Sequence, residues 1–286
     1  MSCGKASVAL GVLGSGAAVS RGYWLSFVAL ASALAVLLAA YPSFDLEVAE
    51  WFFDPGTATF SLSGDYEWNL VRRSASWVPF ILVLPAAFSL LRKLVFPNER
   101  MWIAPSIVLY LLGSLILGPG VASNLVLKDH WGRPRPKGIE QFAGTAKFRP
   151  WWQPSDACKR NCSFVSGEAS HAFWTVAPAS LAPPQLRPVA IGGAVVFGAA
   201  VGTIRIAFGR HFLSDVVFAG IVTLIIVAAL YKLLLDPARR NDARLERGVE
   251  WVSARLHRFA GAVLGRSRAD VGQRGNVIAF HRPALA

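Results

Sequence analysis

The sequence predicts an all-α, polytopic membrane protein in which six helices form a transmembrane bundle. Of its 286 residues, 54% are hydrophobic and only 16% are charged, whereas roughly 25% are charged in soluble domains. The charged residues are clustered and leave long runs without any charge. Six such apolar runs lie at about 23–41, 74–91, 101–127, 169–186, 188–204 and 216–231.

Each run can be judged against the thickness of a bilayer, which a helix crosses with about 20 apolar residues. The first three runs meet that length. The fourth contains Pro178, Pro183 and Pro184, so its helix is expected to end near Leu181. The fifth is rich in Gly and Ala, which suits close helix packing inside a bundle. The sixth is short, but apolar residues extend it on both sides.

Basic residues between the runs predict the orientation of the bundle. The segment 92–100 is basic, and so is the chain after Lys232. Because Lys and Arg gather on the cytoplasmic side of membrane proteins, both termini are expected there. We therefore divide the chain into a cytoplasmic segment 1–22, a six-span unit 23–235 and a basic cytoplasmic tail 236–286. The tail could form an amphipathic helix on the membrane surface, or it could be disordered with some helical bias.

The net charge of +12 raises the question of nucleic-acid binding. The sequence has no motif for it, and the basic residues flank apolar runs, so no nucleic-acid partner is expected. Three cysteines do not make a disulfide framework. Cys158 and Cys162 could pair if their loop is periplasmic, with Cys3 left alone, or all three could remain thiols.

Three polar blocks between the apolar runs are together suited to phosphate chemistry. They read KDHWGRPRP at 128–136, SFVSGEASH at 163–171 and RIAFGRHFLSD at 205–215. The topology brings all three to the face opposite the basic loops, where their cations run against the positive-inside rule. Such an exception indicates a functional anion site at the membrane boundary.

The blocks contain candidate phosphate-binding groups. Lys128, Arg135 and Arg205 are suited to the equatorial oxygens of a phosphoryl group in transfer. Ser166 and Gly167 begin the fourth apolar run, where the N–H groups of a helix N-terminus would face an anion. Glycine lets an oxyanion approach the backbone, and serine either caps the helix or donates to phosphate.

The third block also contains a candidate nucleophile. His211 is assigned this role because a neutral imidazole can attack phosphorus and form a covalent intermediate. Asp215 follows four residues later, on the same face of a helix, and could hold the other ring nitrogen. Both residues are therefore predicted to be catalytic.

Further basic residues are left out of this predicted site. Arg133 and Arg210 are ambiguous and stay outside the core set. Four cations at the ends of apolar runs are interpreted as side chains that reach lipid headgroups: Arg72, Arg73, Arg92 and Lys93.

The arrangement of the blocks resembles the type 2 phosphatidic acid phosphatase superfamily, whose signature is K-x6-RP, then PSGH, then SR-x5-H-x3-D. The first block matches in full from Lys128 to Arg135, and the third matches at Arg205, His211 and Asp215. The resemblance implies a six-helix bundle and phosphate release without a metal or another cofactor. It also implies a phosphohistidine intermediate on His211.

The resemblance covers about 75–235 and has two departures. Val165 and Glu168 stand where the second block of the family has Pro and His, and Ile204 stands where the third has Ser. In the family, that His is thought to protonate the leaving oxygen. We assign this role to Glu168, paired with His171 on the same helical face. Glu168 donates only when protonated, which burial favours and nearby cations oppose. His171 as the donor and a purely structural His171 are the alternatives.

The build of the chain resembles bacterial members of the family. The resemblance therefore implies a periplasm-facing site in the inner membrane, with a membrane lipid phosphate as substrate and the bilayer as partner. The variant SFVSGEAS, with its NCSF lead-in, is similar to the subgroup that acts on lipid A phosphates. Phosphatases of undecaprenyl diphosphate or phosphatidylglycerol phosphate are alternatives. So are a lipid phosphotransferase and a lipid-binding homologue with impaired catalysis. The oligomeric state is left open.

Overall fold

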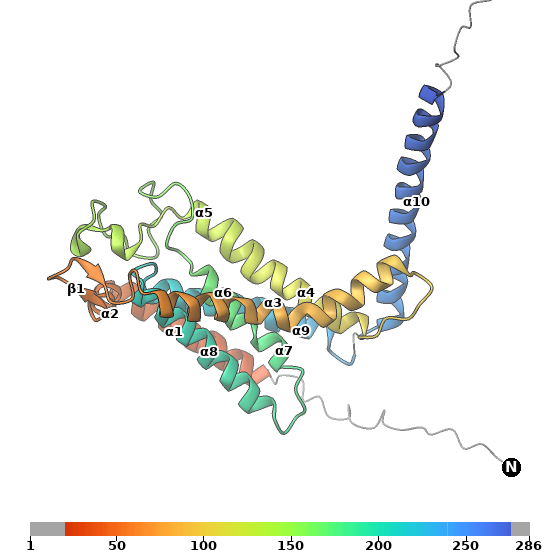
Figure 1. The fold of residues 1–286 in the computed structure, drawn as a ribbon. Helices are drawn as coiled ribbons and strands as arrows, with labels where there is room; N and C mark the ends of the chain where they lie inside the picture. The colour runs from red at the N-terminus through yellow and green to blue at the C-terminus, as the bar shows by residue number, and fades with distance from the viewer. Residues whose placement is uncertain (1–20, 239, 276–286) are drawn as a thin grey trace, which may run out of the picture.

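The computed structural model describes residues 21–238 and 240–275, which are mostly helical (Figure 1). Nearly all of the predicted segment 1–22 and the end of the tail, 276–286, lie outside the described residues. In chain order the elements are α1 (Arg21–Ala40), α2 (Ser43–Glu50), β1 (Phe53–Asp54), β2 (Thr59–Phe60), α3 (Tyr66–Val95), α4 (Pro105–Leu115), η1 (Ile116–Leu127), α5 (Lys128–His130), η2 (Pro136–Gly138), η3 (Glu140–Phe142), α6 (Gly167–Trp174), α7 (Val176–Ala179), α8 (Arg187–Ala207), α9 (Leu213–Leu234) and α10 (Asp242–Gly275).

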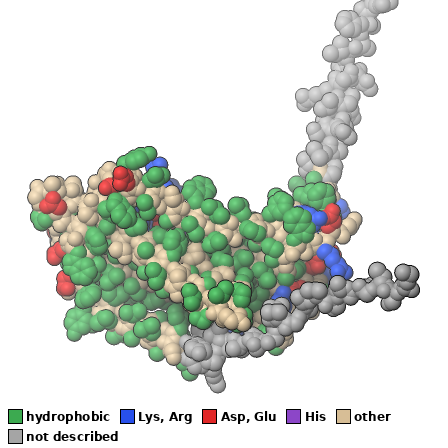
Figure 2. All heavy atoms as spheres, turned by 60° about the horizontal axis from the view of Figure 1, so that its bottom comes forward, with side chains coloured by type: hydrophobic (Ala, Val, Ile, Leu, Met, Phe, Trp, Pro, Cys, Tyr) green, Lys and Arg blue, Asp and Glu red, His purple; other side chains and the backbone are tan. Residues whose placement is uncertain are grey.

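Within the described residues, four helices are long and apolar enough to cross a membrane: Tyr66–Val95, Pro105–His130, Arg187–Ala207 and Leu213–Leu234. A fifth span arises if the pair Leu25–Ala40 and Ser43–Glu50, bent by 86°, is counted as one. The predicted fourth run is divided at Thr175 into α6 and α7, which have 8 and 4 residues. The described part of the protein is therefore mostly helical, with four or five candidate membrane spans, and the count of six stays a prediction. Figure 2 shows apolar side chains along the bundle and charged ones at its two ends.

Local sequence explains where several helices begin and bend. Asp65 caps α3, since its Oδ1 accepts from the backbone N–H of Trp68 over 2.9 Å. Pro79 and Pro85 lie inside α3, as membrane helices tolerate. Between α4 and α5 the chain widens into the π-helical segment η1, which contains Pro119. Proline has no N–H for the regular helical bond, so the ladder shifts at this point.

The short helix α6 packs against α3, η1, α8 and α9. Two glycines of α8 allow close packing against α6 and α9, as the Gly- and Ala-rich fifth run predicted. A Cβ atom on Gly198 would collide with the ring of Phe173, and one on Gly202 would collide with Val216. The helix ends that carry the three polar blocks consequently meet at one end of the bundle.

A long loop between α5 and α6 covers that end of the bundle (Figure 1). Cys158 and Cys162 form a disulfide within this loop. The sequence left open whether these two cysteines pair or remain thiols, and in the structure they pair. The small hairpin of β1 and β2 lies at the same end of the molecule (Figure 1).

At the opposite end, α10 docks on the end of α3 and then leads away from the bundle (Figure 1). Lys93 is buried there, and its Nζ lies 2.7 Å from Oε1 of Glu250 and 3.3 Å from Oε1 of Glu246. Arg92 forms an ion pair with Glu99. The interpretation of these two cations as headgroup contacts was therefore wrong, because both have carboxylate partners within the protein. Whether α10 lies on a membrane surface stays a prediction.

Candidate active site

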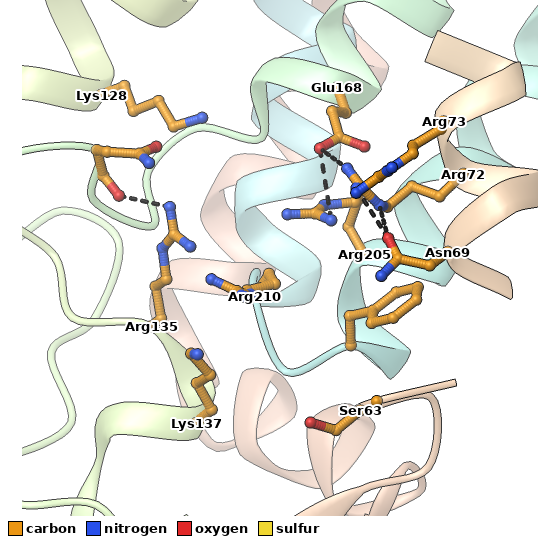
Figure 3. A pocket seen from close by; sticks show the side chains of 13 residues that line it. Ser63, Asn69, Arg72, Arg73, Lys128, Arg135, Lys137, Glu168, Arg205 and Arg210 are labelled. Atoms are coloured by element: carbon orange, nitrogen blue, oxygen red, sulfur yellow. Dashed lines mark hydrogen bonds and ion pairs between the residues drawn. The ribbon is translucent and has the colours of Figure 1, made fainter. Parts of the chain in front are cut away.

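The predicted phosphate-binding cations meet in one pocket. Lys128 begins α5, Arg135 follows in the loop, and Arg205 lies in the last turn of α8. Together with Glu168 in the first turn of α6, they line a cavity of about 340 Å³ (Figure 3). The remaining lining residues are Ser63, Gly64, Asn69, Arg72, Arg73, Lys137, Asn161, Phe208 and Arg210. The excess of cations suits this cavity to an anion.

One buried donor in this pocket has no partner within the described part of the protein. The Nε of Arg205 is buried and has no hydrogen-bond partner among the described residues. Arg135 donates from Nη2 to the carbonyl of Asn161 over 2.6 Å. Burial, and then the positive charge of Arg210, lower the pKa of Arg135. Because a buried donor without a partner is costly, the Arg205 guanidinium indicates an oxyanion site.

The candidate nucleophile, His211, lies in the turn between α8 and α9 and is buried, with 1% of its surface exposed. Its Nδ1 lies 2.7 Å from the carbonyl oxygen of Ser163. A carbonyl can only accept, so Nδ1 carries the proton and Nε2 keeps its lone pair. Burial, together with the positive charges of Arg205 and Lys128, lowers the pKa of His211 to about 4. The carboxylate of Asp215 raises this pKa but offsets only part of the decrease. The ring is therefore neutral at neutral pH, as a nitrogen nucleophile must be.

Asp215 lies close to the ring, but it is not the direct partner of Nδ1. Its Oδ2 is 3.8 Å from Nδ1 of His211, which is too long for a hydrogen bond. This Oδ2 accepts from Oγ of Ser163 over 2.5 Å and from the backbone N–H of Phe212 over 2.7 Å. Ser163 therefore contacts both predicted catalytic residues, with its carbonyl on His211 and its hydroxyl on Asp215. No pattern in the sequence marks Ser163 as the residue that contacts both His211 and Asp215.

A buried ion network holds Asp215 from the other side. Nη1 of Arg133 donates to Oδ1 of Asp215 over 2.6 Å, and Nη2 donates to Oδ2 of Asp45 over 2.7 Å. Ser214 completes the network, since its Oγ donates to Asp45 over 2.6 Å. Burial opposes the charge on Arg133, but the two carboxylates outweigh it and raise the pKa. Arg133, which stayed outside the predicted set, therefore supports Asp215 rather than lining the pocket.

The second block begins α6 but does not line the pocket at Ser166 or Gly167. Oγ of Ser166 accepts from the N–H of Ala169 over 3.4 Å, so this serine is the helix cap. A Cβ atom on Gly167 would collide with the side-chain oxygen of Asn124 and would meet Nζ of Lys128 at 3.3 Å. Glycine thus lets the start of α6 approach η1 and the pocket lysine. The expected contact of these residues with phosphate stays a prediction.

Glu168 and His171 occupy different surroundings. Oε1 of Glu168 lies 2.8 Å from Nη1 of Arg72 and 3.4 Å from Nη1 of Arg205, so the carboxylate bridges α3 and α8 (Figure 3). Nδ1 of His171 donates to the carbonyl of Gly167 over 2.8 Å, and the ring lies 5.4 Å from the ring of Phe80. Of the two candidate proton donors, Glu168 lines the pocket.

The ion pair between Arg72 and Glu168 corrects another interpretation. Arg72 does not reach outward to headgroups, because its guanidinium binds both Glu168 and Oδ1 of Asn69. Arg73 and Arg210 also line the pocket. No signal in the sequence separates such a cation from one that meets a lipid. Within 21–238 and 240–275, the structure contains no cluster of three His, Cys, Asp or Glu that could hold a metal.

Known proteins with a similar sequence are phosphatases, which agrees with a pocket suited to an anion. Residues 107–238 match the sequence profile described as the PAP2 superfamily. A lipid A 4'-phosphatase of Francisella tularensis subsp. novicida is 34% identical over 200 residues, which cover 70% of this chain and 90% of the relative. A lipid A 4'-phosphatase of Rhizobium etli is 30% identical over 229 residues, which cover 74% and 88%. No solved structure is a significant match. The resemblance in the three polar blocks is thus confirmed: the chain belongs to the PAP2 superfamily and is a membrane phosphatase.

Proposed function

We propose that this protein removes the 4'-phosphate of lipid A, at the periplasmic face of the inner membrane, through a phosphohistidine on His211. The observation that carries the chemistry is the state of His211: Nδ1 donates to the carbonyl of Ser163, and among the described residues Nε2 has no hydrogen-bond partner. The ring does not line the cationic pocket itself, but its neighbour Arg210 does, and the charges of the lining residues Arg205 and Lys128 act on it. The names of the two relatives support the choice of lipid A over undecaprenyl diphosphate and phosphatidylglycerol phosphate.

In the first step, Nε2 of His211 attacks phosphorus, a P–N bond forms and the bond to the sugar oxygen breaks. Lys128, Arg135 and Arg205 hold the phosphoryl oxygens and offset the charge that develops on them. The imidazole becomes cationic as it attacks. The proton on Nδ1 stays in its hydrogen bond to the carbonyl of Ser163. The carboxylate of Asp215, 3.8 Å from Nδ1, stabilises the new positive charge.

Glu168 exchanges the proton in both steps. In the resting pocket its carboxylate binds Arg72 and Arg205. When a phosphate monoester binds Arg205 in its place, the carboxylate takes up the proton that the monoester brings as its monoanion, and it gives this proton to the leaving oxygen. The resulting carboxylate then accepts a proton from the water that attacks phosphorus and breaks the P–N bond, and inorganic phosphate leaves. The support for Glu168 is its position in the pocket lining, whereas His171 bonds to the backbone of its own helix.

The proposed topology has six crossings: α1, α3, α4 with η1, α6 with α7, α8 and α9. The fourth crossing is short because α6 and α7 span only Gly167 to Ala179. The positive-inside rule supports a cytoplasmic location for the end with α10, where Lys93, Arg100, Lys232 and Arg240 gather. The pocket at the other end then faces the periplasm.

The function is tested by phosphate release from purified protein in mixed micelles that contain a chelator. Lipid A, undecaprenyl diphosphate and phosphatidylglycerol phosphate are compared, with His211→Ala as the inactive control. We expect inorganic phosphate from lipid A and none from the His211 variant. Binding without turnover on all three lipids would overturn the hydrolase proposal. Transfer of the phosphate to another lipid would identify a phosphotransferase instead.

A further inference from the structure

The pocket carries more positive charge than one phosphate group requires. Seven cationic side chains line it against the single carboxylate of Glu168. A phosphate monoester carries about −1.5 to −2 charges at neutral pH. The three proposed phosphate-binding cations Lys128, Arg135 and Arg205 are sufficient for that group. The remaining cations are Arg72, Arg73, Lys137 and Arg210.

Three of these remaining cations, Arg73, Lys137 and Arg210, form no ion pair among the described residues. Arg72 is bound to Glu168. In the described part of the chain, by contrast, the side chains of Lys137 and Arg210 form no ion pair and no hydrogen bond. Burial, and then the charges of Arg210 and Arg135, lower the pKa of Lys137. These like charges therefore repel one another without a carboxylate between them.

The fold keeps these two side chains together. The backbone N–H of Lys137 donates to the carbonyl of Gly209 over 3.1 Å, which ties the loop after α5 to the turn after α8. Gly209 has a φ of +61°, a conformation that favours glycine, and a Cβ atom there would collide with the ring of Phe60. Figure 3 shows Lys137 and Arg210 beside Arg135 on one side of the pocket, away from Glu168, Arg72 and Arg73.

We propose that Lys137 and Arg210 form a second anion subsite, which binds another anionic group on the headgroup whose phosphate is removed. This inference rests on the proposed function. The chemistry fits a second phosphate or a carboxylate, because an ammonium and a guanidinium bind both. The subsite thereby selects headgroups that carry two anionic groups over those that carry one.

A general electrostatic effect would act differently from a subsite. Positive charge around a cleft attracts every anionic lipid, and the attraction weakens with salt. It would therefore change kcat/KM for all anionic substrates by a similar factor. A subsite instead changes KM only for the substrate that carries the second group, which separates the two explanations.

The test compares three lipid substrates that share the phosphate to be removed. One carries a second phosphate on the headgroup, one carries a carboxylate in its place, and one carries neither. KM and kcat are measured in mixed micelles for the wild-type protein and for the double variant Lys137→Gln/Arg210→Gln. The matched control is Lys147→Gln/Arg160→Gln, which removes the same charge from exposed positions of the same loop outside the pocket.

We expect the wild-type protein to have a KM roughly 10-fold lower for the substrate with a second phosphate, which is the size of one or two charge-assisted contacts. The double variant should lose this preference, because its KM rises several-fold more for the substrate with the second phosphate than for the substrate with one anionic group. The carboxylate substrate shows which second anion the subsite takes, and a lower KM for either one supports it. Equal KM values for all three substrates in the wild-type protein, or an equal loss on all three in the double variant, would overturn the proposal. Absence of turnover on every substrate would refute the proposed function itself.

Discussion

Nη1 of Arg133 lies 2.6 Å from Oδ1 of Asp215, and both side chains are fully buried. The same guanidinium also binds Asp45, which is 88 residues away in the sequence. Arg133 thus fixes the carboxylate that faces the candidate nucleophile, although it does not line the pocket itself. The planar fork of arginine suits this role, because it can bind two carboxylates at the same time.

Replacement of Arg133 by lysine should lower kcat about 10- to 100-fold, which is the usual cost of losing a group that orients a reacting residue. A lysine keeps the charge but cannot hold both carboxylates. KM should change little, since Arg133 does not contact the pocket. Steady-state kinetics on the preferred lipid phosphate check this. Arg160→Lys, an exposed exchange in the same loop, is the matched control.

Arg133→Gln should be worse than Arg133→Lys, because it leaves two buried carboxylates without a cation. Removing one partner of a buried ion pair typically costs about 3–5 kcal/mol. We therefore expect a lower unfolding temperature in detergent together with the loss of kcat. A lysine variant with wild-type kcat and KM would contradict the positioning role of Arg133.

His211 should stay neutral across the physiological pH range. Burial lowers its pKa to about 4, whereas an exposed histidine titrates near 6.5. The unfolded chain therefore binds this proton more tightly than the folded protein does. The contribution of His211 to stability is complete above about pH 6.5 and declines as the pH falls towards 4.

The ring nitrogens of His211 can be followed by NMR in protein that carries ¹⁵N-labelled histidine, with His211→Gln to assign the signal. We expect no titration between pH 5 and 7.5, and a proton on Nδ1, because the carbonyl of Ser163 accepts from that nitrogen. A midpoint near pH 6.5, or a proton on Nε2, would refute the proposed resting state of the nucleophile.

At the other end of the bundle, Lys93 should control the docking of α10 but not catalysis. Its buried ammonium binds Glu246 and Glu250 of α10. Lys93→Met should therefore loosen the start of α10 and speed cleavage by trypsin at Arg240 or Arg244. Lipid phosphatase activity should stay at the wild-type level, because the pocket lies at the opposite end. Unchanged cleavage would contradict this role.

The control for that experiment is Arg255→Met. This exposed guanidinium lies 4.5 Å from the ring of Trp251 on α10 and contacts no carboxylate among the described residues. Like Lys93→Met, this substitution removes one positive charge, but it leaves the ion pairs between α3 and α10 in place. We expect it to leave the rate of cleavage near that of the wild-type protein.

The spacing of the motif residues was enough to predict much of the pocket. Lys128, Arg135 and Arg205 are polar residues next to apolar runs. The motif spacing connects Lys128 to Arg135 in one block and Arg205 to His211 in another. The convergence of the three cations in one pocket follows from the topology, because helices that alternate in direction bring these ends to the same side. Hydropathy also predicted the four long apolar helices, whereas the first run counts as a candidate span only as part of a bent pair and the fourth run is divided at Thr175.

The supporting network could not be predicted, because its contacts are distant in the sequence. Asp45 is one of several acidic residues in the loop after the first apolar run, and nothing local marks it as the partner of Arg133. Arg72 and Lys93 likewise resemble any cation at the end of a membrane helix. Only the tertiary structure shows that a carboxylate, rather than a headgroup, meets each of them.

Two substitutions distinguish Glu168 from His171 as the residue that transfers the proton. Glu168→Gln keeps the shape of the side chain and an oxygen for Arg72, but it cannot carry the proton, so kcat should fall about 10²- to 10⁴-fold. His171→Ala should retain activity within about 10-fold, because this ring bonds to the carbonyl of Gly167 and packs on Phe80 outside the pocket lining. Both variants are compared by kcat on the same lipid phosphate, with binding measured separately. If turnover were lost only in the His171 variant, the assignment of Glu168 would be wrong and the histidine would be the proton donor.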